Sequence, residues 1–218
     1  MTKKNKINKT KKTKKIKIEE EEKKQAEEQE EGENPFEALL GAIDKQESRM
    51  MALFGEVDEE KSSELVFGLL LMSQDNDEEK KAIELYLSTY GGSADDMFSV
   101  YDMMTLVKSK GYPIHTFGLG KVMSAGVLLL ASGTPGHRKI GKHCRVMIHS
   151  CNAGNIGDFH NLKNEMEAIS HLQEMYINAL VNETSMTKRQ LKKLLDRKVN
   201  VYLTAEEAIE YGIADKII

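Results

Sequence analysis

The sequence has few cysteines and no long apolar run. Its two cysteines, Cys144 and Cys151, are too few and too close together to form the disulfide framework of a small secreted protein. No apolar core follows the basic start from Met1 to Lys6, as one would in a secretory signal, and no stretch is apolar over the length that crosses a bilayer. We therefore expect a soluble cytoplasmic protein that does not associate with membranes.

Strong net charge and a phosphate-binding loop are also missing. A formal net charge of -4 and a pI near 5.9 give no overall attraction to nucleic acid. The pattern Gly-x-x-x-x-Gly-Lys-Ser/Thr does not occur, so we do not expect the chain to bind ATP itself. His143, Cys144, His149 and Cys151 could be metal ligands, but His143 and His149 would lie about 20 Å apart along one extended strand, too far to share a zinc ion. We expect neither a metal nor a cofactor.

Composition divides the chain near Pro35. Residues 1–34 consist largely of a lysine block, 3–17, and a glutamate block, 19–33. Such a segment cannot bury enough apolar surface to offset the entropy lost on ordering it. We predict a disordered charged tail over 1–34, with a removable pro-segment or a partner-binding arm as alternatives, and one folded domain over 35–218.

Apolar periodicity predicts an α/β fold. Short apolar runs typical of strands alternate with stripes of apolar residues at three- and four-residue spacing, which are typical of helices. The predicted strands cover 49–54, 83–90 and 113–117, and the helices that follow them cover 62–72, 93–110 and 124–132. This order favours a largely parallel sheet with helical crossovers, in which functional sites gather at the carboxyl ends of the strands.

The second half of the chain adds a long helix. One or two strands are predicted within 139–149 and a last one at 214–218, and capping boxes open short helices at Thr187 and Thr204. Before them, an amphipathic pattern runs from about 159 to 182, and its apolar stripe is predicted to face inward, with Leu162, Met166, Ile169, Leu172, Tyr176 and Leu180. We expect this helix to project from the domain and to pair with a neighbouring subunit.

A serine, a histidine and a glycine pair stand where predicted strands end. Ser124 lies at the start of a helix, His149 closes an apolar strand, and Gly91-Gly92 follows another. These are the parts of an acyl-transfer site, because a serine hydroxyl needs a nearby base and amides that stabilise an oxyanion. Each part also has a structural interpretation, Ser124 as a helix N-cap and His149 as a hydrogen-bonded core residue.

Several motifs, in order from Arg49 to the C-terminus, resemble the proteolytic subunit of the Clp protease, ClpP. They are Phe54-Gly-Glu-Val, Ser88-Thr-Tyr-Gly-Gly-Ser93, Tyr101-Asp102, Met123-Ser-Ala-Gly126, Arg145-Val-Met-Ile-His149 and Leu203-Thr-Ala-Glu-Glu-Ala-Ile-Glu-Tyr-Gly-Ile-Ala-Asp215. The spacing of 25 residues from Ser124 to His149 also matches that family. The resemblance implies a ClpP/crotonase-like spiral of repeated β-β-α units with a projecting handle helix, and a serine endopeptidase activity.

Site roles follow from the same resemblance. It implies that Ser124 is the nucleophile, that His149 is its general base, and that the amides of Gly92 and Ala125 bind the oxyanion. The residues along which an extended peptide substrate would pair as a further strand are Gly154, Asn155, Ile156 and Gly157.

The third catalytic residue of the family, usually an aspartate, corresponds to Asn200 here. Asparagine can accept the N–H of His149, but it carries no charge to stabilise an imidazolium. Asp196 is the nearest carboxylate and a less direct candidate. Ala125 and Cys151 also depart from the family pattern, which leaves the shape of the substrate pocket open.

An assembly is implied as well. Members of the family stack two seven-membered rings around their active sites and receive unfolded proteins from a separate ATP-driven unfoldase. We therefore expect a homo-oligomer that takes part in protein quality control, with an AAA+ unfoldase and unfolded polypeptides as partners. The alternatives are a weakly active or structural ring subunit, which Asn200 favours, a virus-type head-maturation peptidase of the same fold and, more distantly, an acyl-CoA enzyme of the crotonase group.

Overall fold

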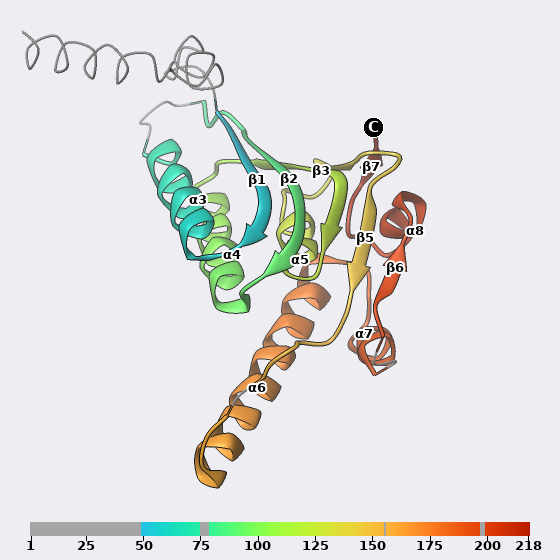
Figure 1. Ribbon diagram of the computed structural model, residues 1–218. Helices are drawn as coiled ribbons and strands as arrows, with labels where there is room; N and C mark the ends of the chain where they lie inside the picture. The colour runs from blue at the N-terminus through green and yellow to red at the C-terminus, as the bar shows by residue number, and fades with distance from the viewer. Residues whose placement is uncertain (1–48, 75–78, 155, 197–198) are drawn as a thin grey trace, which may run out of the picture. The chain divides into compact units, whose positions relative to one another are not determined.

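The computed structural model describes residues 49–74, 79–154, 156–196 and 199–218. They form one unit with a mostly parallel sheet and helices packed against it (Figure 1), which confirms the predicted α/β class. The predicted tail, 1–34, lies outside the described residues. None of the described helices is both long and apolar enough to cross a membrane.

Strand and helix alternate three times in the first half, as the apolar pattern predicts. The elements are β1 (Met50–Val57), α3 (Glu59–Met72), β2 (Ile83–Gly92), α4 (Ala94–Ser109), β3 (Ile114–Met123) and α5 (Ala125–Ala131). The pairs β1–β2 and β2–β3 are both parallel, so α3 and α4 serve as crossover helices. Strand β3 extends six residues beyond the predicted end at residue 117, up to the residue before Ser124.

The second half completes the sheet. Its elements are β4 (Arg138–Ile140), β5 (Arg145–Ile148), α6 (Phe159–Glu183), α7 (Lys188–Leu195), β6 (Val201–Leu203), α8 (Ala205–Glu210) and β7 (Lys216–Ile217). The sheet order is β1-β2-β3-β4-β7, with β5 beside β3, and β6 antiparallel to β5. Both predicted capping boxes are present, at Thr187 and Thr204. Strand β6 was not predicted.

Helix α5 forms the centre of the core. All seven of its residues are buried, and it packs against β2 and β3. Strand β2 presents Ile83, Leu85 and Leu87, each fully buried, on alternate positions. Burial of these side chains holds the start of α5 in a fixed position relative to the ends of the neighbouring strands.

Helix α6 extends away from the sheet (Figure 1). Within the chain it buries only residues of its last two turns, including Tyr176 and Leu180. The prediction that its whole apolar stripe points inward is therefore wrong for the single chain, since Met166 is 73% exposed. Phe159, at the far end of α6, is 75% exposed as well, so apolar side chains there stay open to solvent.

A partly buried ion pair ties the last residues to the core. The guanidinium of Arg138 donates to Asp215, with 2.9 Å between Nε and Oδ2, and also to the backbone carbonyls of Ala131 and Glu183. Burial alone would raise the pKa of the Asp215 carboxyl, but the hydrogen bonds and charge of Arg138 outweigh burial and lower it. The pair thus joins the ends of α5 and α6 to the segment before β7.

Candidate active site

Three parallel strands end at one edge of the sheet, and the predicted site residues follow them directly. Strand β2 ends in Gly91-Gly92, β3 ends one residue before Ser124, and β5 ends one residue before His149. The register pairs Met123 of β3 with Met147 of β5, so both strands stop at the same level. Because carboxyl ends of parallel strands share an edge, residues far apart in sequence meet there.

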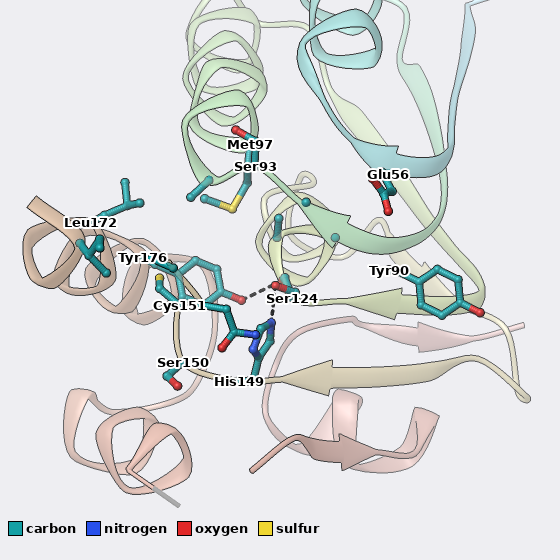
Figure 2. A pocket seen from close by; sticks show the side chains of 17 residues that line it. Glu56, Tyr90, Ser93, Met97, Ser124, His149, Ser150, Cys151, Leu172 and Tyr176 are labelled. Atoms are coloured by element: carbon teal, nitrogen blue, oxygen red, sulfur yellow. Dashed lines mark hydrogen bonds between the residues drawn. The ribbon is translucent and has the colours of Figure 1, made fainter. Parts of the chain in front are cut away.

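Ser124 has a backbone conformation that is unusual for a residue with a side chain. Its φ is 52° and its ψ is -122°, and it is the only non-glycine residue with positive φ among those described. It occupies the N-cap position of α5, yet its hydroxyl makes no capping hydrogen bond. Instead, Oγ lies 2.8 Å from Nε2 of His149 (Figure 2). The capping interpretation of the side chain is therefore wrong, and the hydroxyl faces a base.

His149 is half-buried, and its surroundings favour the neutral ring. Burial lowers its pKa below the ordinary value of 6.5, because a desolvated imidazolium is disfavoured. A ring that accepts the serine proton at Nε2 must carry its own proton on Nδ1, which is the tautomer that a general base requires here. No carboxylate of the described residues forms a hydrogen bond with His149. The lowered pKa therefore favours a ring that is neutral at neutral pH and can accept a proton.

The structure separates the two candidates for a third catalytic residue. The antiparallel register pairs Ile148 with Val201, which brings Asn200 opposite His149 across the start of β6. Asn200 is exposed, and no hydrogen bond joins its side chain to His149. Asp196 instead ends α7 and lines a separate surface hollow beside Lys192. Of the two, Asn200 is the one that the β5–β6 register places opposite His149.

Close packing beside Ser124 requires a glycine at position 91. A Cβ added to Gly91, whose φ is +96°, would lie 2.6 Å from Cβ of Ser124. The N–H of Gly91 donates to Oγ1 of Thr89 at 2.9 Å, so it is already used. Gly92 lines a cleft together with Ser124 and His149, and the N–H of Ala125 has no partner within α5 because Ala125 is the first helical residue. That these two amides bind the oxyanion stays a prediction.

A cleft of about 440 Å³ opens beside Ser124 and His149 (Figure 2). Further lining residues that sequence reasoning did not single out as part of a site include Glu56, Ser150, Met97, Ile169, Leu172 and Tyr176. Of the predicted peptide-pairing residues, Gly154 and Ile156 are exposed and lie in no strand, Gly157 likewise, and Asn155 lies outside the described residues. Their pairing with a substrate stays a prediction.

Tyr176, in the C-terminal turns of α6, contacts Ser124. Its hydroxyl donates to the backbone carbonyl of Ser124 at 2.9 Å. The helix pattern predicted that Tyr176 is inward-facing, but a partner 52 residues away cannot be read from periodicity. The sequence gives one indication of such a contact. A tyrosine stands within the apolar stripe, and a buried hydroxyl needs a hydrogen-bond partner.

Comparison with known proteins agrees with this geometry. A family model described as Clp protease matches residues 36–218. ATP-dependent Clp protease proteolytic subunit 2 of Thermobifida fusca is 30% identical over 170 residues, covering 78% of this chain and 80% of the relative. Subunit 4 of Rhodococcus jostii is 30% identical, covering 86% and 91%, and subunit 1 of Corynebacterium glutamicum is 32% identical, covering 84% and 83%. The chain therefore belongs to the Clp protease family.

Proposed function

We propose that this chain is a serine endopeptidase, the proteolytic subunit of an ATP-dependent Clp protease. The observation that carries the proposal is the 2.8 Å contact between Oγ of Ser124 and Nε2 of His149, inside a cleft at the carboxyl ends of the strands. Family membership supports the same conclusion, since the relatives are named proteolytic subunits. The structural-subunit and virus-type alternatives have no comparable support from the comparisons.

The proposed reaction uses acyl transfer in two steps. Oγ of Ser124 attacks the carbonyl carbon of the peptide while Nε2 of His149 takes its proton, and the amides of Gly92 and Ala125 stabilise the oxyanion. The imidazolium then gives the proton to the leaving amine, and the peptide C–N bond breaks to leave an ester on Ser124. In the second step His149 removes a proton from water, which attacks the ester carbonyl. The imidazolium then returns that proton to Oγ of Ser124 as the ester C–O bond breaks and the carboxylate product leaves.

Substrate and partners follow from the same assignment. Unfolded polypeptide would enter the cleft as an extended strand beside Gly154–Gly157, with its chain supplied by an AAA+ unfoldase that hydrolyses ATP. The open apolar face of α6, with Met166 73% exposed, supports a homo-oligomer in which this helix packs on a second copy. A double seven-membered ring, enclosing the sites, is the proposed assembly.

A serine-directed fluorophosphonate tests the nucleophile. We expect the full-length protein to gain one adduct by intact mass, located on Ser124, because only an activated hydroxyl attacks phosphorus at a useful rate. The Ser124→Ala variant should gain none, and His149→Ala should label at least about 100-fold more slowly. Absence of an adduct in wild-type protein that elutes as an oligomer would contradict the proposed function.

Substitution of Asn200 tests the third position. An aspartate there would stabilise the imidazolium of His149, so we expect Asn200→Asp to raise kcat by about tenfold. The acid limb of kcat/KM, which lies below pH 6.5 in wild type because burial lowers the pKa of His149, should move to higher pH. The change in kcat and the shift of the acid limb are both measured in one pH–rate profile. An unchanged profile would mean that residue 200 does not act on the ring, and Asn200→Ala shows whether the amide itself contributes.

A further inference from the structure

The proposed reaction leaves one polar contact of the site unexplained. Tyr176 is only 6% exposed, and its hydroxyl donates to the carbonyl oxygen of Ser124 at 2.9 Å. Figure 2 shows the phenol pointing from α6 toward the serine, on the side away from Tyr90. Burial raises the pKa of Tyr176, so the hydroxyl keeps its proton and remains a donor at neutral pH.

The carbonyl that Tyr176 holds shares a peptide plane with a predicted oxyanion donor. The C=O of Ser124 and the N–H of Ala125 belong to one trans peptide unit, so they point in opposite directions. A bond that fixes the carbonyl therefore also fixes the direction of the amide. The N–H of Val127 donates to the same oxygen at 3.0 Å, which gives the plane two anchors, one local and one from α6.

The local backbone needs such support. Ser124 stands at φ 52° and ψ -122°, a region that residues with side chains rarely adopt and that persists only when surrounding contacts impose it. On the other side of the residue, the N–H of Ser124 donates to the carbonyl of Met147 at 2.7 Å. Strand β5 thus holds the amide before Ser124, and Tyr176 holds the carbonyl after it.

We propose that Tyr176 is a positioning residue for the oxyanion hole: its hydroxyl holds the Ser124–Ala125 peptide plane so that the N–H of Ala125 faces the developing oxyanion. The inference rests on the proposed function, because it concerns the same acyl-transfer step. Tyr176 itself touches no reacting atom. Its contribution appears when charge develops on the substrate oxygen, so it acts on the transition state more than on substrate binding.

The test is Tyr176→Phe in the full-length protein, which removes one oxygen and leaves the ring. We expect kcat for a fluorogenic peptide to fall by about tenfold, with KM within about twofold. The inhibition constant of a peptide boronate, which forms a tetrahedral adduct on serine, should rise by the same factor as kcat/KM falls. Rates are divided by the concentration of Ser124 titrated with fluorophosphonate, so a partly unfolded sample does not imitate the effect.

Tyr112→Phe is the matched control. Tyr112 is also buried, and its hydroxyl oxygen accepts a hydrogen bond from Nζ of Lys80 at 3.0 Å, away from the candidate site. The Tyr112→Phe variant should keep the wild-type kcat even if its melting temperature is lower. If Tyr176→Phe melts below the assay temperature, Tyr176→Met replaces it, since methionine fills irregular apolar space.

The outcomes separate the two proposals. If wild type labels on Ser124 but Tyr176→Phe keeps kcat and boronate affinity, the positioning role is overturned while the proposed function stands. A rise in KM alone would also overturn it, because Tyr176 would then be only a wall of the cleft. If wild type does not label at all, the proposed function fails and the inference fails with it.

Discussion

Replacement of Ser124 by alanine is expected to lower kcat for peptide hydrolysis by about 10⁶-fold, and replacement of His149 should cost nearly as much. The two residues act as one unit, because Oγ can attack only as Nε2, 2.8 Å away, removes its proton. The double variant should therefore be no slower than either single variant. Steady-state hydrolysis of a fluorogenic peptide by the three variants measures this directly.

The control for these variants is Ser99→Ala. Ser99 is exposed on α4, and its hydroxyl donates to the carbonyl of Asp95, one turn earlier. The Ser99→Ala variant should hydrolyse the peptide at the wild-type rate. A double variant of Ser124 and His149 that falls about 100-fold below both singles would show that the two side chains contribute independently, contrary to the mechanism.

The second large effect concerns stability. We expect Asp215→Ala to lower the free energy of unfolding by about 3 kcal/mol, because it leaves the guanidinium of Arg138, whose side chain is 10% exposed, without its counter-charge. Urea denaturation followed by circular dichroism measures the change. Asp215→Asn should lose less, since the amide oxygen still accepts one hydrogen bond from Arg138.

The same pair predicts a response to acid. Contact with Arg138 holds the folded-state pKa of Asp215 below its ordinary 3.8. The pair therefore stabilises the fold fully above that ordinary value, and the contribution is lost as the pH falls through the lower folded-state pKa. In Asp215→Ala this part of the acid sensitivity should be absent.

Lys163→Ala provides the comparison with an exposed pair. Nζ of Lys163 lies 3.9 Å from Glu167 on α6, with both side chains about two-thirds exposed. Its loss should change the free energy of unfolding by less than about 0.5 kcal/mol, because solvent screens the charges. Equal losses in Lys163→Ala and Asp215→Ala would contradict the role given to burial.

Local signals allowed much of the fold to be predicted from the sequence. Apolar spacing located the crossover helices, and side-chain caps at Ser93, Thr187 and Thr204 fixed where three helices begin. Non-local pairing was harder to predict. Strand β6 has three residues and exists because it pairs with β5, and β3 runs through Gly118 and Gly120, which interrupt its apolar pattern.

The candidate site shows the same division. Ser124 stood out at the start of a predicted helix and His149 at the end of a predicted strand, and parallel strands with helical crossovers bring such positions to one edge. The contact from Tyr176 to Ser124 could not be predicted, because it depends on how the last turns of α6 pack beside the sheet. The side-chain geometry at Asn200 likewise depends on the short antiparallel pairing of β5 and β6, which no local pattern in the sequence indicates.

The backbone of Ser124 has a consequence for the choice of an inert form of this protein. Its φ of 52° and ψ of -122° mirror an extended conformation that glycine adopts without penalty, whereas alanine is as constrained there as serine. Substrate-trapping studies should therefore use Ser124→Gly. That variant removes the nucleophile and also relieves about 1 kcal/mol of backbone strain. The inactive Ser124→Gly protein should therefore have a higher melting temperature than the wild type.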